Sequence, residues 1–179
     1  MAATSMDDVT ESKVLLAEYD RLKEEQRTRI GFRDNLLYFT LAAITAVVAI
    51  SVHSGQSRLL LSAPAICLIL GWAYLVNDEK ISAIGYYVRD QLGPRLGELS
   101  SARGTVFGWE VYHRNVAGRT MRKRFQTAVD LFTYLVLPMV CTTAFWISPT
   151  ARPLLVTTSL VQTLALAVLS WQFLRRAER

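Results

Sequence analysis

Four long runs without a charged residue constrain this chain more than any other feature of its sequence. They cover Leu36 to Val52, Leu59 to Val76, Leu131 to Ile147 and Leu154 to Leu174, and each is 17 to 21 residues long. At about 1.5 Å per helical residue such runs reach roughly 25 to 32 Å, close to a bilayer hydrocarbon core of about 30 Å. The sequence therefore predicts an all-α integral membrane protein with four transmembrane helices.

Composition separates this prediction from a soluble bundle of helices. Hydrophobic residues make up 51% of the chain and charged residues 20%, so the charges must be segregated from the apolar runs. A helix of a soluble bundle keeps a polar face, whereas these runs are apolar all round. A cleaved signal peptide fits poorly as well, because the first 35 residues are charged throughout.

Lys and Arg residues are distributed unequally between the segments that connect the runs. Residues 1–35, 77–126 and 175–179 carry six, nine and three of the 20, whereas each of the two other connections carries one. The positive-inside rule then places both termini and the central segment in the cytoplasm. We expect a multi-pass protein of a bacterial inner (plasma) membrane, with the short connections around Gly55 and Pro149 outside.

The same pattern divides the chain into five segments. They are a cytoplasmic N-terminal helix (1–35), a transmembrane hairpin (36–76), a cytoplasmic helical loop (77–126), a second transmembrane hairpin (127–174) and a cytoplasmic tail (175–179). Leu15 and Leu22 stand at heptad spacing and Glu25 and Arg29 at ion-pair spacing, which predicts an amphipathic helix that runs straight into the first span. This helix packs either on the central loop or against another subunit.

Small residues, glycines and prolines predict local details of these segments. Ala63, Cys67 and Gly71 recur at intervals of four in the second span, and such a face lets membrane helices approach closely. Gly93–Pro94 predicts the end of a helix in the central loop, with a loop from Gly97 to Gly104. Pro138 predicts a kink in the third span. The aromatic residues expected at the membrane interfaces are Tyr38, Trp72, Tyr74, Trp146 and Trp171.

Flat rings and cations gather in the central loop. They are Tyr86, Tyr87, Trp109, Tyr112, His113 and Arg114. Because a ring can stack on a base and a guanidinium can pair with a phosphate, these residues form a candidate ligand or gating surface, with a nucleotide as one conceivable ligand. The alternative is that the rings anchor in the bilayer interface or pack between helices.

Polar residues at the ends and in the middle of the spans form three further candidate groups. Asp34, Asp78 and Asp130 each border a different span, where they either form an acidic ring at a pore mouth or cap and pair within their own helices. Gln162 lies in mid-membrane, so it either bonds to another helix or lines a pore. The residues predicted to contact lipid headgroups are Arg119, Arg122, Lys123 and Arg124.

Sequence motifs for catalysis are missing. The chain contains no HExxH, GxSxG or GxxxxGK[ST] pattern, and Cys67 and Cys141 lie inside apolar runs without the spacing of metal ligands. We therefore expect no enzyme activity, no cofactor and no metal site, and an enzyme that uses His113 is the least favoured hypothesis. The basic excess lies beside the membrane, so no nucleic acid duplex is needed as a partner.

Three stretches between Tyr19 and Arg114 carry a resemblance to a known class of proteins. YDRLKEEQRTRIGFRDN, NDEKISAIGYYVRDQL and GWEVYHR resemble small bacterial multi-span membrane proteins, among them the SLATT family and four-span effectors encoded beside nucleotide-second-messenger defence genes. The resemblance implies an anti-phage effector that oligomerises and permeabilises the inner membrane when a cytosolic protein or nucleotide signals.

Two functions from different classes remain open. The favoured one is a homo-oligomeric, pore-forming or membrane-perturbing effector that is gated by its cytoplasmic helices. The alternative is a non-conducting scaffold or anchor, whose basic central segment recruits a protein partner or anionic lipid. Both keep membrane lipid as a partner.

Overall fold

Helices make up all the regular structure in the described part of the chain. The computed structural model describes residues 2–100, 106–108, 119–148 and 153–177. The helices that are long and apolar enough to cross a membrane number four, as predicted, and are Thr10–Ser54, Ser57–Leu99, Met121–Ile147 and Pro153–Arg176. The fold is therefore all-α, with the composition of a multi-pass membrane protein.

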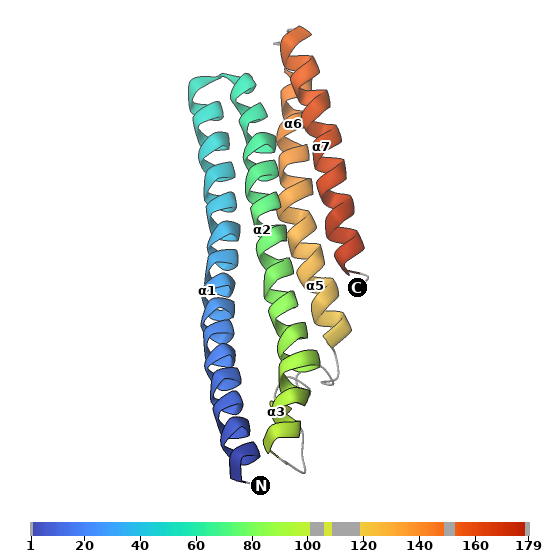
Figure 1. Cartoon of the computed structure of the whole chain (residues 1–179). Helices are drawn as coiled ribbons and strands as arrows, with labels where there is room; N and C mark the ends of the chain where they lie inside the picture. Colours follow the sequence, from blue (N-terminus) through green and yellow to red (C-terminus); the bar gives the residue numbers. More distant parts are fainter. Residues whose placement is uncertain (1, 101–105, 109–118, 149–152, 178–179) are drawn as a thin grey trace. The chain divides into compact units, whose positions relative to one another are not determined.

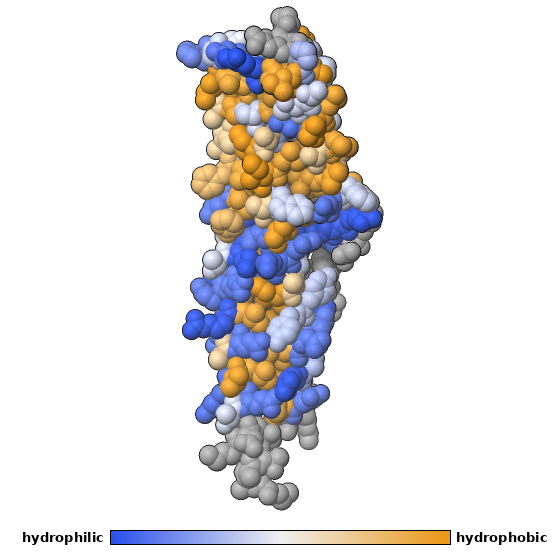
Figure 2. All heavy atoms as spheres, turned by 45° about the horizontal axis from the view of Figure 1, so that its top comes forward, coloured by the Kyte–Doolittle hydropathy of each residue, from blue (hydrophilic) through white to orange (hydrophobic). Residues whose placement is uncertain are grey.

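The chain divides into two compact units. Unit 1 comprises Met1–Phe32 and Asn77–Arg119, and unit 2 comprises Arg33–Val76 and Thr120–Arg179. Helix α1 (Ala2–Ser54) contributes to both units without interruption, so the N-terminal helix does run straight into the first span (Figure 1). Figure 2 shows hydrophobic side chains over most of the face of unit 2 that it draws, whereas hydrophilic side chains predominate over unit 1.

Unit 1 is built on an antiparallel pair of helices. The first part of α1 lies beside the end of α2 (Ser62–Tyr87) and its continuation through η2 (Val88–Leu92) and α3 (Gly93–Ser100). Its buried core is Ile84, Val88, Leu92 and Leu96, packed against Leu15, Tyr19, Leu22, Val106 and Phe107. The N-terminal helix therefore packs on the central segment of its own chain, the first of the two predicted arrangements.

The chain does not leave the helix at Gly93–Pro94, so that prediction was wrong. Gly97 also lies within α3 rather than in a loop, and residues 101–104 lie outside the described residues. A proline inside a helix cannot donate to the carbonyl four residues back, and its ring clashes with that carbonyl. Here the preceding turn widens to a π turn, in which the Gly93 N–H donates to the Val88 carbonyl. The wider turn accommodates the proline.

Unit 2 contains the apolar parts of the spans. Its elements are the second part of α1, η1 (Ser57–Leu61), the first part of α2, most of α5 (Arg119–Leu131), η3 (Phe132–Val136), α6 (Leu137–Ile147) and α7 (Pro153–Ala177). Helix α1 ends at Gly55, whose φ of 66° is the left-handed conformation that glycine adopts readily. The short connection to η1 makes α1 and α2 antiparallel neighbours in Figure 1, as predicted.

Close helix packing in unit 2 depends on the small face of the second span. Ala63 and Cys67 are fully buried, and a Cβ atom on Gly71 would lie 2.9 Å from both Tyr134 Cδ1 and Leu169 Cδ2. The predicted close approach is confirmed. At Pro138, where the sequence predicts a kink, the structure has a preceding second π turn, η3, in which the Leu137 N–H donates to the Phe132 carbonyl.

Candidate functional site

A polar cluster within unit 2 is centred on Asp130 of α5. This residue is only 7% exposed, and its Oδ1 atom accepts hydrogen bonds from Tyr74 Oη at 2.8 Å and from Gln126 Nε2 at 3.1 Å. Gln126 Nε2 also donates to Tyr74 Oη at 2.8 Å. A buried carboxylate is expensive unless it is hydrogen-bonded, so these bonds fix α2 against α5.

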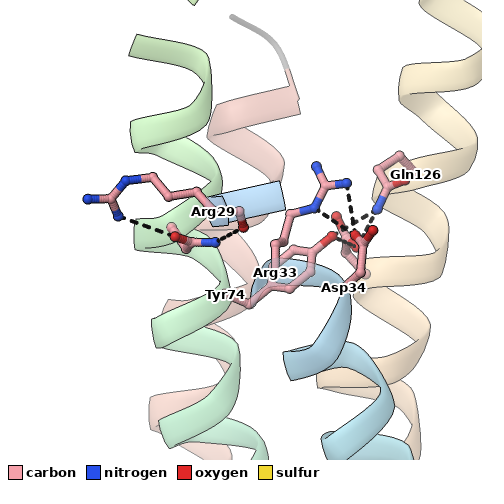
Figure 3. A network of polar contacts seen from close by, with 7 residues as sticks. Arg29, Arg33, Asp34, Tyr74 and Gln126 are labelled. Atoms are coloured by element: carbon pink, nitrogen blue, oxygen red, sulfur yellow. Dashed lines mark hydrogen bonds and ion pairs between the residues drawn. The ribbon is translucent and has the colours of Figure 1, made fainter. Parts of the chain in front are cut away.

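The first span adds a cation beside this cluster. Arg33 of α1 pairs with Asp34 at 3.1 Å, and Figure 3 shows Arg33, Asp34, Tyr74 and Gln126 pointing toward one another. Elsewhere in unit 2, Arg176 of α7 donates through Nη1 to the carbonyl oxygen of Leu75 of α2 at 3.0 Å. Polar side chains of three spans therefore meet in the cluster, and a fourth span is joined to α2 by Arg176.

Hydrogen bonds also join α1 to α2 within unit 1. Asn77 Nδ2 donates to the carbonyl oxygen of Arg29 at 2.6 Å, and Arg29 Nη1 donates to Asn77 Oδ1 at 3.3 Å. Gln26 Nε2 donates to the carbonyl oxygen of Ile81 at 3.1 Å. These bonds tie the paired helices to a single register, because each one joins a side chain to a particular position on the partner helix.

The aromatic and cationic surface predicted in the central loop is described only in part. Tyr87 is half-exposed and its hydroxyl donates to Glu18 Oε1 at 2.8 Å, a bond that raises the pKa of Tyr87. The Arg89 guanidinium lies 5.2 Å from the centre of the Tyr86 ring, the ring-and-cation arrangement expected of this surface. The remaining members, Trp109, Tyr112, His113 and Arg114, lie outside the described residues. A ligand or gating role here stays a prediction.

The three aspartates have different surroundings. Asp34 is ion-paired with its neighbour Arg33 and Asp130 is buried in hydrogen bonds, both within unit 2, whereas Asp78 is half-buried in unit 1. The partners of Asp34 and Asp130 lie in their own chain, as the capping-and-pairing alternative expects. An acidic ring at a pore mouth stays a prediction.

Gln162 is partly buried, whereas the basic residues predicted to contact lipid headgroups are exposed or half-exposed where their side chains are described. Gln162 is partly buried on α7, and its Oε1 atom is buried without a hydrogen-bond partner among the described residues. Arg122 and Arg124 are exposed and Lys123 is half-exposed, while the side chain of Arg119 lies outside the described residues. Within the described ranges no group of three or more His, Cys, Asp or Glu residues is placed to hold a metal ion.

Sequence reasoning missed the role of Tyr74. Tyr38, Trp72, Trp146 and Trp171 are exposed as expected of interfacial rings, but Tyr74 is only 2% exposed, so its ring packs between helices of unit 2 rather than against lipid. Its position three residues after Gly71 on the small face of the second span could have predicted burial. Gln126 and Arg33 carried no sequence signal that marked them.

The polar cluster holds helices together. A carboxylate, a phenol and an amide that bond to one another can break and re-form as a unit when helices move. A comparison with protein-family models, with curated proteins and with solved structures finds no match to this chain.

Proposed function

We propose that this chain is a homo-oligomeric, pore-forming or membrane-perturbing effector of the inner membrane, gated by the helices of unit 1. The observation that carries the proposal is the continuity of α1, a single helix over Ala2–Ser54 that belongs to both units. A packed helix moves as a rigid element, so a change in the packing of unit 1 displaces the first span as well. The signal is a cytoplasmic protein or a nucleotide.

The polar cluster supports gating because hydrogen bonds that join several groups break and re-form as a unit when helices move. Tyr74 of α2 forms one hydrogen bond with Gln126 and one with Asp130, and Gln126 also donates to Asp130 within α5. Displacing either helix breaks the two bonds to Tyr74, and water then replaces the lost partner of the carboxylate. Entry of water at this position in unit 2 is the first step of opening.

An unsatisfied polar atom supports an assembly of several copies. Gln162 Oε1 is buried without a hydrogen-bond partner among the described residues, and such a group costs several kcal/mol in hydrocarbon. Side chains such as Gln commonly bond across helices in membranes. Because the atom is buried within the single chain, we infer that α7 rearranges on assembly and brings Gln162 to a neighbouring subunit or to water in a shared pore.

Membrane potential in living cells tests the proposal. Induced expression should depolarise bacteria that carry a potential-sensitive dye, and Gln162→Leu should reduce the depolarisation because it removes the polar group. Val161→Leu is the matched control, since Val161 is an exposed neighbour on the same helix. Full potential in cells whose membranes contain the chain, with or without the candidate signals, would rule the pore out.

A second candidate, the non-conducting scaffold, is favoured by one observation. Met121 and Phe125 of α5 are each 63% exposed. The two apolar side chains flank the basic run Arg122–Lys123–Arg124, and apolar and basic side chains in this mixture bind the headgroup region of anionic bilayers. Binding of purified chain to anionic vesicles, lost on changing Arg122, Lys123 and Arg124 to Gln, together with an unchanged membrane potential in cells, would favour the scaffold over the pore.

A further inference from the structure

Two residues beyond the end of α3 return to the helices of unit 1. Val106 and Phe107, here named the clasp, pack against the buried stripe of Ile84, Val88, Leu92 and Leu96. Both are themselves half-buried. The clasp thus covers the core of unit 1 without belonging to either long helix.

The clasp contacts α1 through an aromatic stack. The rings of Phe107 and Tyr19 lie parallel within 8°, with their centres 4.1 Å apart. Tyr19 stands between Leu15 and Leu22 on the face of α1 that packs on the core. The stack therefore attaches the clasp to α1 at the middle of its contact with α2 and η2.

The clasp contacts α3 over two glycines one turn apart. A Cβ atom on Gly93 would lie 3.6 Å from both Phe107 Cδ2 and the Val106 carbonyl oxygen, and one on Gly97 would lie 3.7 Å from Val106 Cγ2. Glycine at both positions leaves a smooth helix surface on which the clasp rests. One short segment thus bridges α1 and α3.

The backbone of the clasp is strained. Phe107 has a φ of 59°, the one positive φ at a residue other than glycine in the described part of the chain. An aromatic residue adopts this left-handed conformation only when its surroundings compensate the cost. Here the stack on Tyr19 and the packing of Phe107 on the buried stripe supply that compensation. The strain opposes closure and is relieved when the clasp leaves these contacts.

We propose that the clasp is a releasable lock that holds α1 against α2, η2 and α3 and keeps the gate shut. The inference rests on the proposed function, and it names the segment that must be released before the pore opens. Release relaxes Phe107, uncovers Tyr19 and loosens the packing of α1. Because α1 continues into the first span, the loosening reaches unit 2.

Removing the ring tests the lock by two measurements on the purified full chain. In Phe107→Ala we expect backbone amides of residues 15–22 and 84–96 to exchange roughly tenfold faster, since the stack and the burial of the ring are lost. In liposomes the same variant should release a trapped dye several-fold faster than wild type. Phe107→Tyr keeps the stack and should behave as wild type, as should Val14→Ala at an exposed position of α1.

A second variant displaces the clasp without touching it. Gly97→Leu fills the space of Val106 while favouring the helix, so it should reproduce both effects of Phe107→Ala with α3 intact. Unchanged amide exchange in both variants, or dye release from wild type that neither variant accelerates, overturns the lock alone. Liposomes that retain their dye with every variant overturn the proposed pore, and the lock with it.

Discussion

At the residue scale, Gly71 is a position where the packing of unit 2 leaves no room for an added side-chain atom. Gly71→Ala places a methyl group 2.9 Å from the fully buried Tyr134 ring and from Leu169. The ring cannot move aside as the Leu methyl can, so we expect the change to cost about 1–3 kcal/mol of unfolding free energy. Thermal unfolding of the purified protein in detergent, followed by circular dichroism, measures the loss.

Gly31 provides the matched control for this substitution. It lies inside α1, and a Cβ atom there would meet nothing within 4 Å. Gly31→Ala should therefore raise stability by about 0.5–1 kcal/mol through helix propensity alone. Equal effects of the two substitutions would contradict the close packing described around Gly71.

Single residues show where sequence reasoning succeeds and where it stops. The interval of four between Ala63, Cys67 and Gly71 is visible in the sequence, and it predicted a close helix contact that the structure has. The pairing of Tyr74 with Asp130 was not predictable, because the two are 56 positions apart. Which residues meet across two helices depends on their relative rotation and depth, and the hydrophobic pattern leaves both undetermined.

At the element scale, the π turn η2 aligns the buried stripe of unit 1. Ile84, Val88, Leu92 and Leu96 follow one another at intervals of four. Over these twelve steps a regular α-helix would rotate the stripe by about 120°, and a single residue absorbed in a π turn reduces the rotation to about 20°. All four side chains consequently face α1 and the clasp.

Deleting Gln91, an exposed residue of η2, tests why the π turn is there. The deletion restores a regular helix and keeps the stripe aligned, but it forces the Pro94 ring against the carbonyl four residues before it. We expect a cost of about 3 kcal/mol in the native background and little in Pro94→Ala. Amide exchange at Leu92 and Leu96 measures the cost of the deletion in the native background and in Pro94→Ala. An equal cost in the two backgrounds would show that the π turn is unrelated to the proline.

The error at Gly93–Pro94 has a physical origin. The dipeptide ends most helices, and only the continuation of the apolar stripe from Val88 through Leu92 to Leu96 distinguishes this site. Local turn propensity competed with tertiary packing here, and packing prevailed. The same spacing between a π turn and a proline recurs at Pro138. One residue separates Pro138 from the π turn Phe132–Val136, as one residue separates Pro94 from η2.

At the scale of the whole molecule, the segregation of charge was the most informative sequence signal. The four apolar runs that it leaves predicted four helices long enough to cross a membrane, and the structure has them. The segregation left the interior of unit 2 undetermined, because four apolar runs pack in many ways when lipid and protein are equally apolar. The polar cluster selects among these arrangements.

Membrane orientation is the prediction on which the proposed gating depends most. Of 20 Lys and Arg residues, 18 lie in segments 1–35, 77–126 and 175–179, so these segments should remain in the cytoplasm. A cysteine at exposed Gln56 should then react with an impermeant maleimide on intact cells, and one at exposed Glu79 only after lysis. The native thiols, Cys67 and Cys141, are buried and should leave the background low. Labelling of Glu79→Cys from outside would place unit 1 beyond the reach of any cytoplasmic signal.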